Sequence, residues 1–274
     1  MLFRSNFVNE YNFKNFILAI KSAGFITPKI LNSKITLDFA YTLFLILQQS
    51  GEVPKTEIKK YVQKWFVLST LTGRYITSSE SQMDRDLRDI ASKGFKTFFE
   101  ENERALLPEN FWKVRLVQNL ETSSISSPYF NVYLAAQIFF KDNSLLSNSS
   151  GVADLITIVG DVHHIFPKAY LKENDFNDKS LYNQVANYTY LDTTINIAVG
   201  KKSPDEYFSQ ALTACNSSDQ NGWIIKDETV FWQNLDENCL PRHIITMTAA
   251  DYPDFLKERR VLMAQKIRDY YEKL

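Results

Sequence analysis

Two adjacent histidines stand in the stretch GDVHHIFPKAYL, residues 160–171, of a chain that contains three histidines in all. A histidine can take a proton from water near neutral pH because its unperturbed pKa is about 6.5. A divalent cation beside it can neutralise the charge of a phosphodiester and stabilise the leaving oxygen. One imidazole of such a pair can bind the metal ion while its neighbour faces the attacking water. His163 and His164 can share the work of phosphodiester hydrolysis in this way, although two neighbouring histidines by themselves are more often an accident of surface sequence.

Two asparagines further along the chain can complete this site. The side-chain carbonyl of Asn187 can fix the imidazole of the base in one orientation, although it can equally bond the backbone of the loop. Asn196 follows nine residues later and can offer its carbonyl oxygen to the metal. Lys201 and Lys202 come next, where they either contact phosphate or cap the end of a helix.

A candidate for a further metal ligand precedes the histidines. Asp161 lies two residues before His163 and can bind the metal directly or through water. It is equally a typical turn residue after the glycine at position 160. His243 has no matching partners in the sequence around it, and we expect it to be structural.

These residues need short elements to position them. The stretch DLITIVG, 154–160, is short and β-branched, and it predicts a first strand. Residues 184–191 predict a second strand, and residues 192–200 predict a short helix that ends at Gly200. The order strand, loop, strand, helix is a compact ββα unit. A long amphipathic helix is expected from residue 251 to residue 274.

The part of the chain before this unit indicates consecutive helices. Apolar residues recur at helical spacing over residues 7–24 and 36–49, and prolines begin further helices at positions 54, 108 and 128. Residues 143–151 are small and polar and mark the best boundary. We predict a helical domain over residues 1–145 and a second domain, with the ββα unit and the C-terminal helices, over residues 146–274. The fold class is mainly α with a small ββα core, an α+β arrangement.

The stretch DVHHIFPKAYL…NYTYLDTTINIAVGKKSPDEYF resembles the HNH, or ββα-metal, nuclease motif. More narrowly, it resembles the C-terminal nuclease domain of GmrSD-type restriction endonucleases, which implies that residues 146–274 are an HNH-like nuclease domain with a ββα-metal core. The resemblance implies that His164 is the general base and that Asn187 orients it or supports the fold. It also implies that His163 and Asn196 bind the metal, with Asp161 as an additional ligand.

The resemblance extends into the helical part of the chain. Residues 59–90 are similar to the helical region that follows an N-terminal nucleotide-binding domain with a DGQQR motif in that family. No DGQQR motif occurs here. We therefore expect the chain to correspond to the C-terminal two thirds of such a protein, and a nucleotide-binding domain or subunit is a candidate partner.

The expected function is that of a divalent-metal-dependent endonuclease that hydrolyses DNA, including modified DNA, in bacterial restriction and defence against phage. Mg²⁺ or Mn²⁺ suits a helix-borne carbonyl with water, while an imidazole ligand also admits Ni²⁺ or Zn²⁺. Two alternatives stay open: a non-catalytic module that binds nucleic acid or a partner, and an RNase or toxin. The formal net charge of −1 gives no support to nucleic-acid binding.

Local charge and composition add further expectations. Residues 54–96 contain nine Lys or Arg and five Asp or Glu, which indicates either a DNA-facing surface or a solvated helix face. Arg74 and Tyr75 are expected to pack and form ion pairs within the helical part. Cys215 and Cys239 lie far apart, so we expect free thiols in a cytoplasmic protein. The longest apolar stretch is too short for a membrane span, and the oligomeric state is left open.

Overall fold

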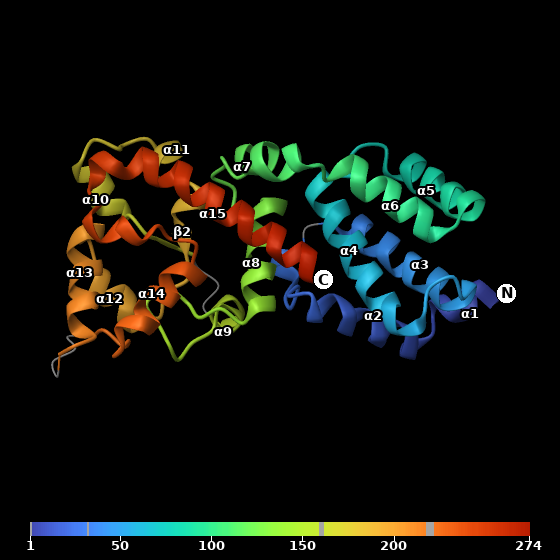
Figure 1. Ribbon diagram of the computed structural model, residues 1–274, viewed down its shortest axis with the longest axis horizontal. Helices are drawn as coiled ribbons and strands as arrows, with labels where there is room; N and C mark the ends of the chain where they lie inside the picture. The colour runs from blue at the N-terminus through green and yellow to red at the C-terminus, as the bar shows by residue number, and fades with distance from the viewer. Residues whose placement is uncertain (1, 32, 159–161, 218–221) are drawn as a thin grey trace.

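The computed structural model describes residues 2–31, 33–158, 162–217 and 222–274, and it is mostly helical (Figure 1). Its α-helices are α1 Leu2–Phe7, α2 Glu10–Ser22, α3 Lys34–Ser50, α4 Lys55–Thr72, α5 Ser79–Lys93, α6 Phe95–Leu106, α7 Leu116–Asn119, α8 Pro128–Phe140, α9 Val152–Ile158, α10 Lys168–Glu173, α11 Lys179–Tyr182, α12 Thr193–Val199, α13 Pro204–Ala214, α14 Glu228–Glu237 and α15 Tyr252–Lys273. The strands are β1 His163–His164 and β2 Tyr188–Thr189. Short 3₁₀ turns cover Pro28–Ile30, Val185–Asn187, Arg242–Thr246 and Ala249–Asp251.

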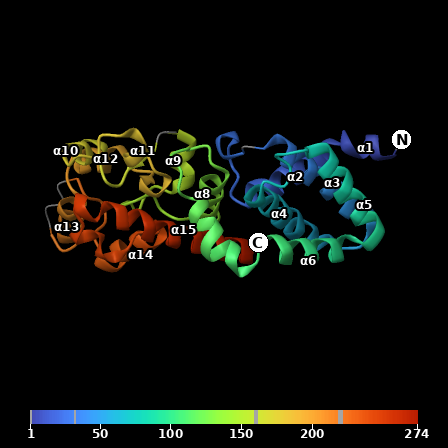
Figure 2. The same cartoon turned by 90° about the horizontal axis from the view of Figure 1, so that it is seen from above.

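The molecule is elongated in both views (Figures 1 and 2). Helices α1–α6 form one end, helices α9–α14 form the other, and α7, α8 and α15 lie between them. The predicted mainly helical class is confirmed. The helix expected from residue 108 begins at residue 109, forms a π-helical turn over Phe111–Arg115 and continues as α7.

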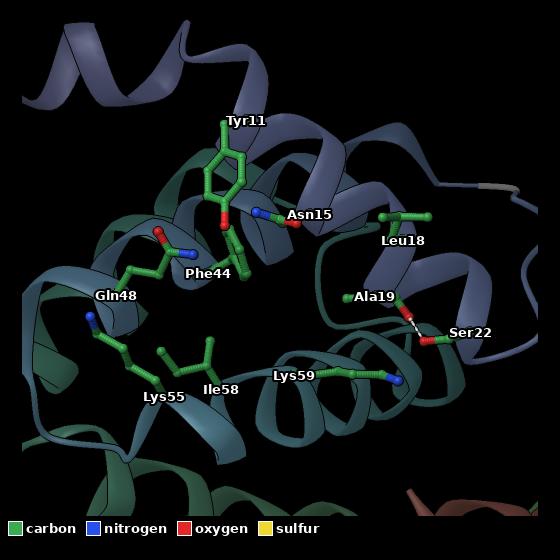
Figure 3. A pocket seen from close by; sticks show the side chains of 10 residues that line it. All are labelled: Tyr11, Asn15, Leu18, Ala19, Ser22, Phe44, Gln48, Lys55, Ile58 and Lys59. Carbon is green, nitrogen blue, oxygen red and sulfur yellow. Dashed lines mark hydrogen bonds between the residues drawn. The ribbon is translucent and has the colours of Figure 1, made fainter.

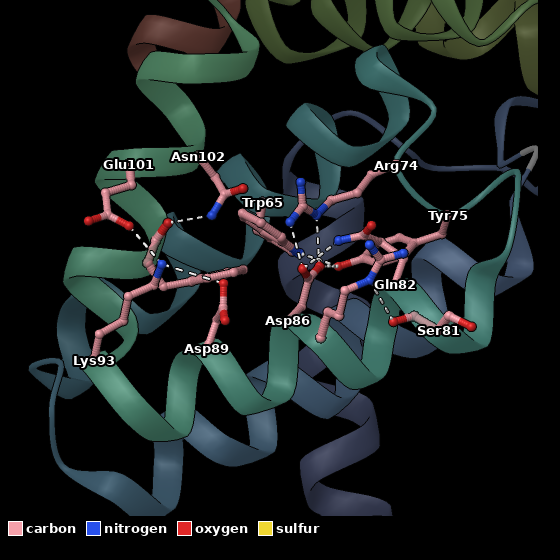
Figure 4. Close-up of polar contacts among 12 residues, drawn as sticks. Trp65, Arg74, Tyr75, Ser81, Gln82, Asp86, Asp89, Lys93, Glu101 and Asn102 are labelled. Carbon is pink, nitrogen blue, oxygen red and sulfur yellow. Dashed lines mark hydrogen bonds and ion pairs between the residues drawn. The ribbon is translucent and has the colours of Figure 1, made fainter.

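A buried polar network holds α5 against α4 (Figure 4). The carboxylate of Asp86 is almost fully buried and accepts hydrogen bonds from Arg74 Nε at 2.7 Å, Tyr75 Oη at 2.8 Å and Gln82 Nε2 at 2.8 Å. Trp65 Nε1 donates in turn to the Tyr75 hydroxyl at 3.1 Å. Buried polar groups cost free energy unless they are paired, and here each is paired. The packing and ion-pair role predicted for Arg74 and Tyr75 is therefore confirmed.

Helix α15 connects the two ends of the molecule, and it confirms the predicted C-terminal helix. It packs against α8 and α7, and α8 packs in turn against α4 and α9. The Tyr270 hydroxyl donates to the Ala23 carbonyl at 2.6 Å. Buried apolar side chains form one continuous core that includes residues on both sides of position 145. The division into 1–145 and 146–274 stays a prediction, with helix packing across it.

The segment 143–151 is buried at residues 144–147 and exposed at residues 148 and 149. Ser144, Leu146 and Ser147 are buried, and Asn234 of α14 bonds their backbone. Its Oδ1 accepts from Leu146 N at 2.7 Å, and its Nδ2 donates to the carbonyls of Ser144 and Ser147 at 2.9 and 3.0 Å. The small polar residues therefore serve a tight turn whose backbone groups are satisfied by one buried amide.

The first predicted strand is wrong, because residues 152–158 form α9. Val152, Leu155 and Ile156 recur at helical spacing and are buried, so packing overrides the strand propensity of the β-branched residues. Asp154 Oδ2 accepts from Gly151 N at 3.1 Å at the beginning of this helix. Residues 159–161 lie outside the described part of the chain.

A strand, a second strand and α12 follow one another as expected, but the first strand lies at the histidines and not over residues 154–160. β1 pairs antiparallel with β2, and His163 lies opposite Thr189 and His164 opposite Tyr188. The second predicted strand is shorter than expected, because residues 185–187 form a 3₁₀ turn. Helix α12 is followed by Gly200, whose positive φ of 55° is one that glycine adopts more readily than other residues. The assignment of these elements to a ββα-metal core stays a proposal.

Candidate metal and phosphate site

The residues after the two histidines hold β1 in place. Ile165, Phe166 and Pro167 are buried, whereas His163 and His164 are only half-buried. The ring of Phe166 packs against α15, with its centroid 5.0 Å from that of Tyr252 and 4.8 Å from that of Phe255. Three consecutive apolar residues thus anchor the strand in the core, and the histidines remain at its surface.

An open cleft of about 450 Å³ lies beside β1. Its walls are β1 and the facing sides of α10 and α12, at the end of the molecule distant from the N-terminus (Figure 1). The lining residues are Val162, His163, His164, Pro167, Lys168, Ala169, Lys172, Asn196, Val199 and Gly200. The structure therefore brings together three of the predicted site residues: both histidines and Asn196.

Asn187 fixes the loop after β1 rather than the imidazole of His164. Its side chain is fully buried. Its Oδ1 accepts from Phe166 N at 2.8 Å, and its Nδ2 donates to the carbonyls of Phe166 and Tyr182 at 3.1 and 3.2 Å. These bonds use the amide on both its oxygen and its nitrogen. Of the two roles considered for Asn187, the geometry favours support of the loop.

Asn183 is the asparagine that contacts the base, and the sequence reasoning missed it. Its Oδ1 lies 3.0 Å from His164 Nε2. An amide oxygen can only accept a hydrogen bond, so Nε2 carries the proton and Nδ1 carries the lone pair. This is the tautomer that a base needs, because Nδ1 is then able to take a proton from water.

Burial lowers the pKa of His164 below its usual value. The hydrogen bond with Asn183 opposes this shift, while the charges of Lys168 and His163 add to it. The imidazole is therefore neutral near pH 7, as a base must be before it accepts a proton.

Asn196 faces the cleft because of the helical period of α12. Ile195 and Val199 are buried on the inner side of the helix, which leaves Asn196 exposed. Its side-chain amide forms no hydrogen bond within the described part of the chain. It is therefore available to a ligand in the cleft.

Lys201 and Lys202 lie at the end of α12, outside the lining of the cleft. Lys201 is exposed and pairs loosely with Glu173, with 3.7 Å between its Nζ and the carboxylate. Lys202 donates to the Ala198 carbonyl at the end of the helix. This placement corresponds to the capping alternative rather than to phosphate contact.

Two lysines of α10 occupy the cleft instead. Lys168 and Lys172 are four residues apart, so they share one face of the helix, and both line the cleft. Their Nζ atoms stand over the ring of Tyr182, at 5.3 and 5.6 Å from its centroid. Neither pairs with a carboxylate among the described residues. Their spacing directly after the HHIFP stretch is the sequence signal that would have identified them.

The donors around the cleft would leave most positions of a bound cation to water. His163 offers a nitrogen and Asn196 an amide oxygen, and both line the same open space. Over residues 2–31, 33–158, 162–217 and 222–274, no group of three His, Cys, Asp or Glu side chains lies close enough to hold a metal. The predicted ligand Asp161 lies outside these residues. The amide oxygen and the water are compatible with Mg²⁺ or Mn²⁺, and the imidazole also admits Ni²⁺ or Zn²⁺.

A buried arginine of α15 supports the second strand from below. Arg259 is about 1% exposed. Its Nη1 donates to the carbonyls of Ala186 and Tyr188 at 3.0 and 2.8 Å, and its Nη2 donates to that of Asn238 at 3.2 Å. The carbonyls on either side of Asn187 are thereby fixed from α15. No local sequence pattern reveals this contact, because Arg259 and Ala186 are 73 residues apart in the chain.

Comparison with known proteins gives one distant relative and no family. No family model matches the chain, and no solved structure matches it. An uncharacterized protein of Methanocaldococcus jannaschii is 25% identical over 197 residues, which cover 67% of this chain and 30% of that protein. The chain thus spans about a third of the length of this relative.

Among the described helices, none combines the length and the apolar character that crossing a bilayer requires.

Proposed function

We propose that this protein is a divalent-metal-dependent endonuclease that hydrolyses phosphodiester bonds of DNA. The observation that carries the proposal is the cleft that His163, His164 and Asn196 line together. Lys168 and Lys172 add positive charge to the same space. The resemblance to the HNH motif also rests on His163, His164 and Asn196. A role in restriction of foreign DNA follows from that resemblance alone.

His164 is the base in this proposal. Its Nδ1 takes the proton of the attacking water, and Asn183 holds the ring in the tautomer that makes this possible. The lowered pKa keeps the imidazole neutral before the reaction. Asn187 holds the backbone of Phe166, and the ring of Phe166 anchors β1 against α15.

His163 and Asn196 would hold the metal ion. When bound, a Mg²⁺-class ion supplies neutralisation of the phosphate charge and stabilisation of the leaving oxygen. Lys168 and Lys172 bind the phosphates that flank the scissile bond, in place of the predicted Lys201 and Lys202.

A plasmid-nicking assay with Mg²⁺ or Mn²⁺ tests the proposal. Loss of a general base costs roughly 100-fold to 10,000-fold in rate, which is the loss expected for His164→Ala. The matched control is His243→Ala, because His243 is exposed, pairs with Glu258 at 3.2 Å and lies outside the cleft. EDTA should abolish cleavage by the wild-type protein. Undiminished cleavage by His164→Ala would remove His164 from its role.

The same assay separates the alternatives. Cleavage of RNA but not of DNA would assign the site to an RNase. Metal binding at His163 and Asn196 without turnover on either nucleic acid would leave a binding module. A Lys168→Ala and Lys172→Ala double variant should raise KM for DNA, whereas Lys201→Ala should not.

A further inference from the structure

A larger cleft lies at the opposite end of the molecule, between α2, α3 and α4 (Figure 3). Its volume is about 680 Å³, which is within the range of small-molecule sites. Its lining consists of Tyr11, Asn15, Leu18, Ala19, Ser22, Phe44, Gln48, Lys55, Ile58 and Lys59. No step of the proposed nuclease reaction uses these residues.

The floor of this cleft is apolar and fixed. Phe44 and Ile58 are 5% and 4% exposed and close it from below. At one end, Gln63 Nε2 donates to the Ala19 carbonyl at 2.7 Å and to the Ser22 hydroxyl at 2.9 Å. These bonds tie α2 to α4 and fix the two walls relative to each other at that end.

Large side chains stand at the rim with little protein against them. Tyr11 is 73% exposed and Leu18 is 63% exposed, and both belong to the face of α2 that borders the cleft. Figure 3 shows the Tyr11 ring extending from α2 toward the cleft, on the side of Phe44. An exposed aromatic ring beside an apolar floor offers a surface on which a flat ring can stack.

The polar side chains of the walls have unused capacity. The amides of Asn15 and Gln48 are partly buried, and neither forms a hydrogen bond within the described ranges. Lys55 and Lys59 are one turn apart on α4, and neither pairs with a carboxylate there. Each amide both donates and accepts, and each ammonium donates only. The cleft therefore presents two positive charges and two bifunctional amides around an apolar floor.

We propose that this cleft binds one nucleotide unit, either a residue of single-stranded nucleic acid or a free nucleotide. Lys55 and Lys59 bind the phosphate. The amides of Asn15 and Gln48 bond the edge of the base, as such amides do with adenine. The base stacks on Tyr11 above the apolar floor. The excess of Lys and Arg over residues 54–96, noted in the sequence, includes both lysines.

Binding is tested on the full chain in EDTA, with fluorescence anisotropy of a labelled ten-nucleotide single strand and calorimetry with dAMP. The test variant is Lys55→Ala with Lys59→Ala. The matched control is Lys29→Ala with Lys60→Ala, because both residues are exposed, neither lines the cleft, and the same charge is removed. The test variant should lower the salt dependence of single-strand binding by about 0.7 in log–log slope, since the two lysines contact one phosphate and one phosphate contact contributes about 0.7.

Tyr11→Ala supplies a second measurement, because this exposed side chain is removed without disturbing the core. Loss of a base stack should weaken binding between about fivefold and 150-fold. Retained binding by the Lys168→Ala and Lys172→Ala double variant, which lacks the phosphate-binding lysines of the other cleft, separates this site from the proposed nuclease site.

The two ligands identify the source of the nucleotide. If the test variant loses binding of the oligonucleotide and the control variant keeps it, the cleft is a strand site. If the test variant loses binding of dAMP and the control variant keeps it, the cleft is a free-nucleotide site. Equal binding by the test and control variants, or no binding of either ligand by the wild type, overturns the proposal.

Discussion

Replacing Asn187 by alanine should destabilise the fold far more than replacing Asn183, although both asparagines lie near His164. The Asn187 side chain is the partner of both backbone groups of Phe166, at 2.8 Å from its N–H and 3.1 Å from its carbonyl. Phe166 is fully buried, so neither group gains water when the amide is removed. An unsatisfied buried group costs about 1–3 kcal/mol, so the two together cost about 2–6 kcal/mol.

The third bond of Asn187 adds little to this sum. The Tyr182 carbonyl that it reaches also accepts from the Tyr252 hydroxyl, at 3.4 Å, and keeps that partner in the variant. Asn183→Ala removes one contact, the bond to the half-buried His164 ring. Its expected loss is the net value of one hydrogen bond, about 0.5–1.5 kcal/mol.

Urea unfolding followed by circular dichroism measures both losses in free energy of unfolding. If Asn187→Ala loses no more stability than Asn183→Ala, the reasoning is refuted, and the amide of Asn187 is not what holds the loop. A protein that no longer folds would place the loss at or beyond the upper end of the range. Thermal unfolding in a stabilising osmolyte then recovers a value.

Three further outcomes are expected. Asn183→Ala should leave His164 as a mixture of tautomers, which ¹⁵N NMR of the imidazole detects; an unchanged Nε2-protonated signal would contradict the contact. Asp86→Ala should lower the free energy of unfolding by about 3–5 kcal/mol, because it leaves Arg74 as a buried charge without its partner; a loss below about 1 kcal/mol in urea unfolding would argue against the network. Burial raises the pKa of Asp142 from 3.8 to about 6, so the folded state binds the proton more tightly than the unfolded state. The contribution of Asp142 to the free energy of unfolding is therefore present below pH 4 and falls by about 3 kcal/mol as the pH rises through 6. The difference in free energy of unfolding between wild type and Asp142→Asn, followed across this pH range, measures this fall. A difference that does not change with pH would contradict the pKa shift.

Helical period and chain-breaking residues were sufficient to predict most of the helices. The helices expected before residue 143 are present, and so are the short helix that ends at Gly200 and the long C-terminal helix. In these elements the local pattern and the packed face agree. The strand expected over 154–160 was wrong, because β-branched propensity is a weak preference and the burial of Val152, Leu155 and Ile156 on one helical face outweighed it.

The sequence by itself determined which residues gather at the candidate site: the histidine pair, the apolar IFP anchor behind it, and an asparagine on the outer face of a short helix. Only the tertiary structure decided which asparagine touches His164, which lysines enter the cleft, and that Arg259 fixes the strand from α15. The physical reason is that periodicity fixes the direction of a side chain on its own element. Its partners depend on how distant elements pack, and that packing is set by the whole core.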